Sequence, residues 1–229
     1  MTIRVALRQS LRLGFIHPRE SATLDYYPGV QFRLLTLAVT VCVFTSCAQK
    51  DRIHTVRVSV ADQKMVVFRK EQPIAMYDVS TSKFGLGDAP GSKCTPLGRM
   101  EIAKKIGGGA PIGMKFKDRK PTGEVVPVDA PGRDPIVTRI LWLRGKESQN
   151  RRAYGRTIYI HGTAEERKIG HPASYGCIRM RSRDIVQLYD TVGYGAVVEV
   201  VPGPLGVSLA QTQPSVPATT APNGARVAQ

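Results

Sequence analysis

Two residues, His161 and Cys177, have types and a spacing that suit covalent chemistry, with fifteen residues between them. A cysteine attacks a carbonyl carbon as its thiolate, and a nearby imidazole can accept the thiol proton and lower the thiol pKa. Gly176 lets the backbone approach a substrate closely and can direct amide groups at an oxyanion. Arg179 adds fixed positive charge nearby. The pattern therefore predicts acyl transfer with Cys177 as nucleophile and His161 as base.

Structural roles are the alternative for residues of these types. A lone cysteine usually packs as a small apolar residue, and a lone histidine is commonly a hydrogen-bonded structural residue. We interpret His171, in a Gly-His-Pro loop, as a loop residue, and His54, at the domain start, as structural or exposed. The acidic residues lack the paired spacing that a glycosidase needs.

The four cysteines are Cys42, Cys47, Cys94 and Cys177, and no two of them have the CxxC spacing of a zinc site. A metal site is therefore not predicted. Cys94 has two interpretations. It is either a packed thiol or a disulfide partner of Cys177 that silences the enzyme under oxidising conditions.

A longer pattern surrounds the two reactive residues. His161 opens the segment HGT at 161–163, and Cys177 lies within SYGCIRM at 174–180. Together with CTPLGRMEI at 94–102, these segments resemble the L,D-transpeptidase catalytic domain family (YkuD-type), over roughly residues 53–202. One departure is Tyr175, where the family usually has histidine. A tyrosine keeps a ring and a hydrogen-bonding tip at that position.

The resemblance implies roles for further residues. It gives Cys177 and His161 the catalytic roles, and it implies that the residues shaping the site and its oxyanion pocket are Ser174, Tyr175, Gly176, Gly162 and Arg179. Candidate substrate contacts are Thr95, in the loop that borders the site, and Tyr154 and Arg156, just before the catalytic strand. For Tyr154 and Arg156 a solvated loop is the alternative. No metal or organic cofactor is implied.

The reaction implied by the resemblance is ping-pong acyl transfer on peptidoglycan. Cys177 would attack the third residue of a tetrapeptide stem, commonly diaminopimelate, and release D-alanine from the thioester. The acceptor would be an amine of a neighbouring stem, giving a 3→3 cross-link, or an amine of a protein such as an outer-membrane protein. Carbapenem-type β-lactams would acylate the same cysteine.

Three other functions stay open at this stage. With water as acceptor, the enzyme would be an L,D-carboxypeptidase. A wall-binding lipoprotein without activity would keep the fold, with Tyr175 marking decay of the site, although Cys177, His161 and Arg179 are all present. A thiol-exchange protein would use Cys94 and Cys177, but these lack CxxC spacing.

Short β-branched segments with turn signals between them predict the elements that carry the motifs. We expect strands at 53–60, 64–69, 74–80, 99–106, 136–143, 157–161 and 196–201, and a hairpin that turns at 121–123. One helix is expected over 182–192, with Ser182 as N-cap and Asp184 at its N-terminal end. The predicted class is mainly β, a sandwich or barrel-like domain with one or two short helices.

Composition and the two ends of the chain bound its location. The net charge of +15 suits anionic surroundings, and no helix-turn-helix, zinc-finger or RNA-binding signature is present, so nucleic acid is not a predicted partner. The apolar run 34–46 before Cys47 predicts a lipoprotein signal within 1–47, and the polar residues ahead of it lead to the hypothesis that translation starts near Val30. Cys47 would then carry the lipid that anchors the exported protein to a membrane, in the cell envelope or periplasm. The catalytic domain is predicted at 48–203 and a disordered Pro/Thr/Ala/Gln-rich tail at 204–229.

Overall fold

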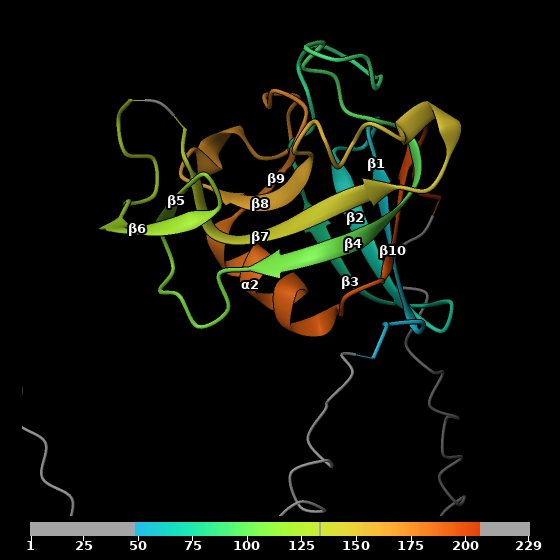
Figure 1. Ribbon diagram of the computed structural model, residues 1–229, viewed down its shortest axis with the longest axis horizontal. Coiled ribbons are helices and arrows are strands. Elements are labelled where there is room, and N and C mark those ends of the chain that lie inside the picture. Colours follow the sequence, from blue (N-terminus) through green and yellow to red (C-terminus); the bar gives the residue numbers. More distant parts are fainter. Residues whose placement is uncertain (1–48, 133, 207–229) are drawn as a thin grey trace, which may run out of the picture. The chain divides into compact units, whose positions relative to one another are not determined.

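The computed structural model describes residues 49–206 apart from 133. The predicted signal, its Cys47, the start near Val30 and nearly all of the predicted tail lie outside these residues. Within them are ten strands and one α-helix, α2, together with two short 3₁₀ helices (Figure 1). The elements are β1 (His54–Ser59), β2 (Lys64–Arg69), β3 (Gln72–Asp78), β4 (Gly98–Ile106), β5 (Met114–Lys117), β6 (Lys120–Val125), β7 (Ile136–Gly145), η1 (Ser148–Asn150), β8 (Tyr159–Thr163), η2 (Glu166–Lys168), β9 (Ile178–Met180), α2 (Ser182–Thr191) and β10 (Val197–Val201).

All ten strands belong to one mixed sheet. Its main path runs β3-β2-β1-β10-β4-β7-β5-β6, while β8 pairs with β7 and with β9. The pairs β1–β10 and β8–β9 are parallel and the others are antiparallel. A single bridge between Ser80 and Arg179 joins the segment after β3 to β9, but the sheet does not close. The mainly β prediction with a short helix is therefore confirmed.

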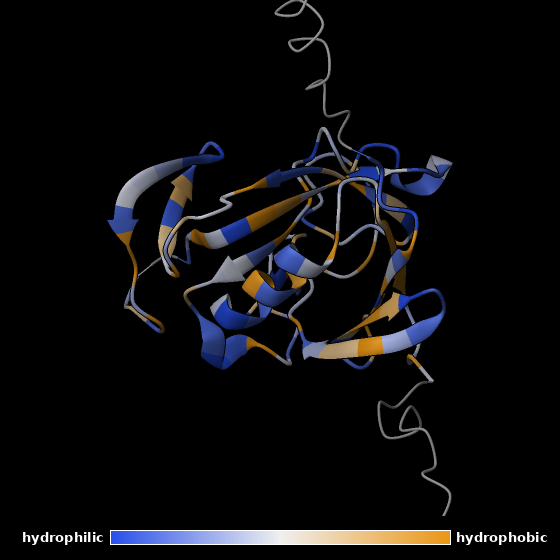
Figure 2. Cartoon of the chain, turned by 90° about the horizontal axis from the view of Figure 1, so that it is seen from below, coloured by the Kyte–Doolittle hydropathy of each residue, from blue (hydrophilic) through white to orange (hydrophobic). Residues whose placement is uncertain are grey.

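The core forms where the alternating apolar residues of the strands meet the apolar face of α2. Val56 and Val58 of β1 are fully buried, as are Ile160 of β8 and Ile178 of β9. The alternation appears in Figure 2 as orange and blue segments along the strands. Ile185 and Leu188 of α2 are also fully buried, and α2 packs on β7 and β8. Burying each such side chain contributes about 1.5–3 kcal/mol, which fixes the helix against β7 and against β8, the strand that carries His161.

The start of α2 differs from the prediction. Arg181, not Ser182, occupies the N-cap position, and its side chain makes no capping hydrogen bond. Ser182 is buried, and its Oγ accepts a hydrogen bond from Thr138 Oγ1 at 2.9 Å. The Ser182 N–H donates to Glu166 Oε1 at 2.8 Å, so a side chain from η2 satisfies the helix start. Asp184 does lie in the first turn, as predicted.

The β5–β6 hairpin also turns at another place than predicted. Its strands pair Lys117 with Lys120, so the turn residues are Asp118 and Arg119 and not 121–123. Both have positive φ, 50° and 68°, as a two-residue hairpin turn of the primed type requires. The Pro-Thr-Gly signal therefore falls inside β6. The three-residue strand β9 was not predicted at all, because it is too short to give a periodic signal.

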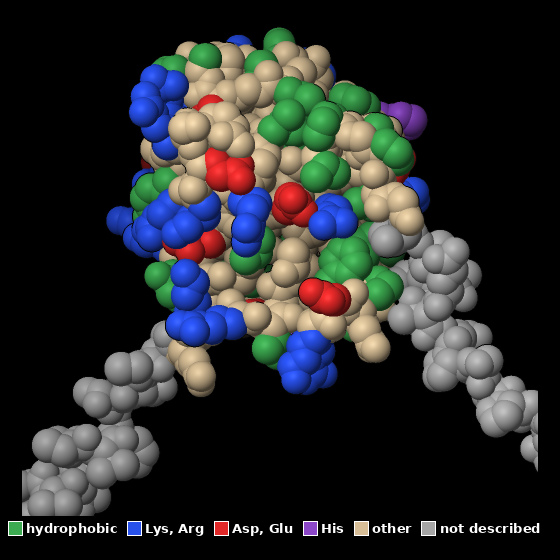
Figure 3. All heavy atoms as spheres, turned by 90° about the vertical axis from the view of Figure 1, so that its right-hand side faces the viewer, with side chains coloured by type: hydrophobic (Ala, Val, Ile, Leu, Met, Phe, Trp, Pro, Cys, Tyr) green, Lys and Arg blue, Asp and Glu red, His purple; other side chains and the backbone are tan. Residues whose placement is uncertain are grey.

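Surface charge is mixed. On the face drawn in Figure 3, basic and acidic side chains are interspersed, in keeping with a basic chain that pairs many of its carboxylates. No helix among the described residues is both long enough and apolar enough to cross a membrane.

Candidate active site

The parallel pair β8–β9 brings the two halves of the motif together. Its register pairs Ile160 with Ile178 and His161 with Arg179. Side chains alternate along a strand, so Ile160 and Ile178 enter the core while His161 and Arg179 lie on the opposite face. Cys177 directly precedes β9 and therefore lies on the same face as His161, as its diagonal neighbour. The two candidate catalytic residues are thus related by a sheet register, with Cys177 at the end of the turn that leads into β9.

His161 is held in one tautomer. Its ring is only 4% exposed, and Nδ1 lies 2.8 Å from the carbonyl oxygen of Gly162. Because a carbonyl can only accept, Nδ1 carries the proton and Nε2 keeps its lone pair. Burial lowers the pKa of His161, and the Gly162 carbonyl and Asp134 only partly oppose this. The imidazole is therefore neutral at pH 7, which is the form a general base needs.

Gly162 itself is required by close packing. A Cβ at this position would lie 2.7 Å from the backbone oxygen of Val137 on β7. Since that backbone atom belongs to the paired strand, any side chain here would push β8 away from β7. The glycine therefore keeps the carbonyl that orients His161 in place.

Cys177 is a partly buried free thiol. It packs against the cluster of Phe116, Ile140 and Tyr159, and its Sγ lies 3.5 Å from the carbonyl oxygen of Thr157. Burial raises the pKa of the Cys177 thiol to about 11, although the Tyr159 amide and the charges of Arg179 and Arg156 act in the opposite direction. The expectation of a thiol pKa lowered by the imidazole is thus wrong for this structure. Both members of the pair are neutral.

The turn before Cys177 is fixed by Ser174. This buried serine donates its hydroxyl hydrogen to the carbonyl of Cys177 and accepts the N–H of Gly176 at 3.2 Å. Gly176 has φ of +115°, and a Cβ there would meet the Cys94 carbonyl at 3.1 Å. Both the backbone conformation and the lack of space therefore call for glycine directly before the nucleophile.

A long loop, residues 83–96, covers this turn; we call it the 83–96 loop. The N–H of Lys83 donates to the Ser174 carbonyl at 3.2 Å, and Thr95 Oγ1 donates to the Gly176 carbonyl at 3.1 Å. Arg156 donates to Asp88 Oδ1 at 2.9 Å and to the Cys94 carbonyl at 2.8 Å. Thr95 and Arg156 therefore hold the loop on the turn, and their predicted contact with substrate stays a prediction.

Aromatic residues line two sides of the site. Tyr175 is 55% exposed and its ring lies 5.3 Å from that of Phe84, measured between centroids. Tyr154 stacks on Trp142 with centroids 4.2 Å apart, and Trp142 meets Tyr159 edge-on at 5.6 Å. Trp142 and Cys177 pack on the same apolar cluster, and the role of Tyr154 as a substrate contact stays a prediction.

Arg179 belongs to a buried ionic network that the sequence did not indicate. Its Nε lies 3.0 Å from Asp134 Oδ2, as an ion pair without hydrogen-bond alignment, and its Nη1 lies 3.3 Å from Glu165 Oε2. Asp134 Oδ1 accepts hydrogen bonds from Thr163 Oγ1 at 2.6 Å and from the Ala164 N–H at 3.1 Å. The network thereby fastens the end of β8, just after His161, to β9. The only sequence signal for Asp134 is an acidic residue placed two residues before a strand.

Comparison with known proteins decides the family. The family model described as YkuD, the L,D-transpeptidase catalytic domain, matches residues 53–200. The chain belongs to this family.

Individual relatives agree with this assignment. The chain is 36% identical over 77 residues to the probable L,D-transpeptidase YcfS of Escherichia coli, covering 34% of this chain and 21% of the relative. It is 26% identical over 195 residues to the probable L,D-transpeptidase ErfK/SrfK of Salmonella typhimurium, covering 82% of this chain and 58% of the relative. The chain thus spans less than two thirds of the length of these curated relatives. A crystal structure of the L,D-transpeptidase from Xylanimonas cellulosilytica is similar at 16% identity, with TM-score 0.43, 73% of this chain and 69% of that chain covered.

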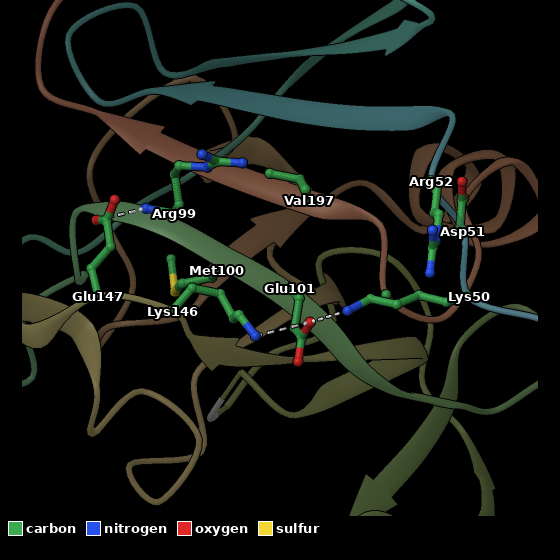
Figure 4. Close-up of a pocket in the computed structure, with 10 residues that line it drawn as sticks. Lys50, Asp51, Arg52, Arg99, Met100, Glu101, Lys146, Glu147 and Val197 are labelled. Atoms are coloured by element: carbon green, nitrogen blue, oxygen red, sulfur yellow. Dashed lines mark hydrogen bonds and ion pairs between the residues drawn. The ribbon is translucent and has the colours of Figure 1, made fainter.

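Two hollows lie in different regions of this L,D-transpeptidase domain. One, of about 370 Å³, lies beside the motif and is lined by Lys83, Gly132, Asp134, Glu165, Lys168, Ala173, Tyr175 and Arg179. The other, of about 540 Å³, lies along β4 and β10 around the buried carboxylate of Glu101 (Figure 4). Lys50 and Lys146 both point at Glu101. Neither Cys177 nor His161 lines either hollow, but the smaller one is lined by Tyr175 and Arg179 of the SYGCIRM segment and the larger one by no residue of the HGT or SYGCIRM segments. The smaller hollow is therefore the candidate active site.

The remaining cysteine and histidines of the L,D-transpeptidase domain lie outside the reactive pair. Cys94 is a free thiol whose Sγ lies 3.1 Å from the Phe84 carbonyl, so the proposed disulfide with Cys177 is not formed here and stays a prediction for oxidising conditions. His54 forms an ion pair with Asp51 at 2.9 Å, and the carbonyl of His171 accepts a hydrogen bond from Ser80. The described residues contain no group of three His, Cys, Asp or Glu side chains that could hold a metal ion.

Proposed function

We propose that this chain is a peptidoglycan L,D-transpeptidase with Cys177 as nucleophile and His161 as general base. The observation that supports the proposal most is the β8–β9 register, in which the tautomer-fixed His161 pairs with Arg179, two residues after Cys177, next to a hollow lined by Tyr175 and Arg179. The family membership supplies the reaction class, and the site supplies the residues for it.

In the first half-reaction, Cys177 Sγ attacks the carbonyl carbon of the third residue of a donor tetrapeptide stem. The thiol proton passes to His161 Nε2 as the S–C bond forms. Collapse of the tetrahedral intermediate breaks the C–N bond to D-alanine, and the imidazolium returns the proton to the leaving amine. The product is a thioester on Cys177, and no oxidant or cofactor enters the balance.

The neutral resting state sets how the proton moves. Burial raises the pKa of the Cys177 thiol and lowers that of His161, so a standing thiolate–imidazolium pair is disfavoured before substrate binds. We infer that proton transfer accompanies attack on the carbonyl. The Gly176 N–H is used by Ser174, so we assign oxyanion stabilisation to the backbone N–H groups of Cys177 and Tyr175.

The second half-reaction needs an acceptor. An amine of a neighbouring stem would attack the thioester and form a 3→3 cross-link, and a protein amine would instead anchor that protein to the wall. Water as acceptor would make the enzyme an L,D-carboxypeptidase. We propose the amine reaction as the main one, in an exported protein of the cell envelope that is anchored through lipid on Cys47.

The proposal is tested with the purified chain in detergent, under reducing conditions, with a disaccharide tetrapeptide. Mass spectrometry follows release of D-alanine and the mass of the protein. We expect D-alanine release and an acyl adduct on Cys177 in the wild type, and neither in Cys177→Ala. The matched control Cys94→Ala removes the other described thiol and should retain turnover.

The products then separate the acceptors. A dimer linked 3→3 identifies a stem amine, and a free tripeptide identifies water. If the folded and fully reduced wild type gives neither adduct nor D-alanine, the proposed activity is wrong.

A further inference from the structure

Two lysines converge on the exposed aromatic pair beside the motif. The Lys83 Nζ lies 4.8 Å from the centroid of the Tyr175 ring and 5.3 Å from that of Phe84. The Lys93 Nζ lies 5.5 Å from both centroids. The two rings are 46% and 55% exposed, for Phe84 and Tyr175 in that order. Two cations therefore share one aromatic platform at the surface of the site.

Neither lysine has a carboxylate partner among the ion pairs of residues 49–206. Other lysines of the same domain do: Lys64 reaches Asp78 at 2.9 Å, and Lys115 reaches Glu124 at 2.7 Å. The neighbouring Lys168 is paired with Glu165 at 2.7 Å. Two like charges held over the same rings repel each other, and a shared anion would relieve that repulsion.

The backbone at Lys93 is held in an unfavourable conformation. Lys93 has φ of +59°, and its carbonyl accepts a hydrogen bond from Ser82 Oγ. Non-glycine residues rarely adopt this region outside tight turns. Lys70 and Arg119 also adopt it, but in hairpin turns, whereas Lys93 lies in the long 83–96 loop. An unfavourable backbone conformation beside a reactive site indicates a functional role. For Lys93, the group available for such a role is its ammonium group.

The geometry favours an anion over a sugar ring as the ligand. The ammonium groups of Lys83 and Lys93 already lie over the rings of Phe84 and Tyr175. They therefore cover part of the ring faces on which a sugar would stack. Arg179, which also lines the hollow of about 370 Å³, is neutralised by Asp134 and Glu165. The uncompensated positive charge at this end of the hollow therefore comes from Lys83, and Lys93 adds a second positive charge over the same two rings.

We propose that Lys83 and Lys93 bind an internal carboxylate of the peptide stem, and so make this enzyme selective for acidic stems over amidated ones. The inference rests on the proposed function, because it takes the stem peptide as the substrate of the adjacent Cys177. The lysines would be specificity-determining residues, with no part in bond making.

The experiment compares two disaccharide tetrapeptides, one with free internal carboxylates and one with these groups amidated. With the full chain, we expect Lys83→Gln/Lys93→Gln to raise KM for the acidic stem about tenfold or more, while kcat changes by less than about threefold. For the amidated stem we expect the wild type and the double variant to differ by less than about twofold. The KM of the wild type for the acidic stem should also rise with salt.

The matched control is Lys70→Gln. Lys70 is another exposed lysine with positive φ, 47°, in the β2–β3 turn, at the far end of β3 from the 83–96 loop. It should leave both KM values unchanged. A KM that rises equally for both stems, or for neither, overturns the inference.

A binding measurement separates this inference from the proposed activity. Calorimetric titration of Cys177→Ala with the acidic stem should give an affinity that the added Lys83→Gln/Lys93→Gln changes weaken about tenfold, and that amidation weakens equally. If the wild type turns over neither stem, the proposed function fails and this titration alone decides the inference. An affinity that is insensitive to the lysines overturns it.

Discussion

Two ionic clusters in this domain have opposite composition. At the candidate active site, one buried cation, Arg179, faces the two carboxylates of Asp134 and Glu165. Along β4, the single carboxylate of Glu101 faces three cations, Lys50 at 2.9 Å and Arg144 and Lys146 at 3.5 Å each. The signs are reversed, but the more important difference is the exposure of the partners.

In the Arg179 cluster the central cation and both carboxylates are buried, with side-chain exposures of 7% for Arg179, 5% for Asp134 and 13% for Glu165; only Lys168, which also pairs with Glu165, is exposed, at 46%. In the Glu101 cluster only the carboxylate is buried, at 9%, while its cations are 46–50% exposed. Charges removed from water interact strongly and cannot be replaced by solvent, whereas exposed partners exchange with water at little cost. The buried Arg179 cluster therefore lies where β8 and β9 hold His161 and Cys177 next to each other.

The largest expected effect follows from breaking the buried cluster. Arg179→Met should lower the free energy of unfolding by about 3–5 kcal/mol, because it leaves the Asp134 carboxylate buried without its cation and Glu165 with only the half-exposed Lys168. Urea unfolding followed by circular dichroism measures this. D-alanine release should fall as well, because β8 and β9 lose the contact that joins their ends.

The control for this change is Arg144→Met in the other cluster, which should cost less than about 0.5 kcal/mol because Arg144 is 46% exposed. Equal losses for Arg144→Met and Arg179→Met would contradict the distinction between the clusters. Arg179→Lys tests geometry separately. It should restore little of the stability, since one ammonium cannot reach both carboxylates as Nε and Nη1 do.

A smaller effect is expected at the centre of the other cluster. Glu101→Gln should lower the free energy of unfolding by about 1 kcal/mol, because the half-exposed cations can return to water. The kcat for D-alanine release should be unchanged. A loss as large as that of Arg179→Met would show that the Glu101 cluster is as rigid as the catalytic one.

The smallest effect is a difference in acid sensitivity between the two regions. Burial raises the pKa of Glu101, but the hydrogen bond from Lys50 and the charges of Lys146 and Lys50 outweigh it and lower that pKa below 4.5. Its stabilisation is present above pH 4.5 and is lost as the pH falls through the lower folded value. Burial lowers the pKa of His161 below 6.5, so this residue's stabilisation is lost in a higher window, as the pH falls from 6.5.

Unfolding free energies measured from pH 7.5 to 3 in wild type, His161→Gln and Glu101→Gln would separate the two windows. His161→Gln should flatten the slope just below pH 6.5, and Glu101→Gln should flatten it only below pH 4.5. The same slope change in both variants would refute the assignment.

The sequence was sufficient for the parts that depend on neighbouring residues. The alternating segments specified most strands, and the 3.6-residue pattern specified α2 within one residue of its end. The HGT and SYGCIRM segments were sufficient to indicate the family, and His161 and Cys177 were singled out from them. The β5–β6 turn and the Ser182 cap were predicted wrongly, because glycine and serine have strong local preferences that tertiary contacts overrode.

The sequence by itself determined the family and the mainly β class, and it singled out Cys177 and His161 as the proposed nucleophile and base, because each of these rests on residue type and short-range periodicity. Only the tertiary structure decided that Asp134 and Glu165 face Arg179. It also decided that the ammonium groups of Lys83 and Lys93 both lie over the ring of Tyr175. It also decided that the pKa of the Cys177 thiol is raised, not lowered. The physical reason is that burial and charge pairing depend on which distant segments the sheet brings together, and no local pattern encodes that.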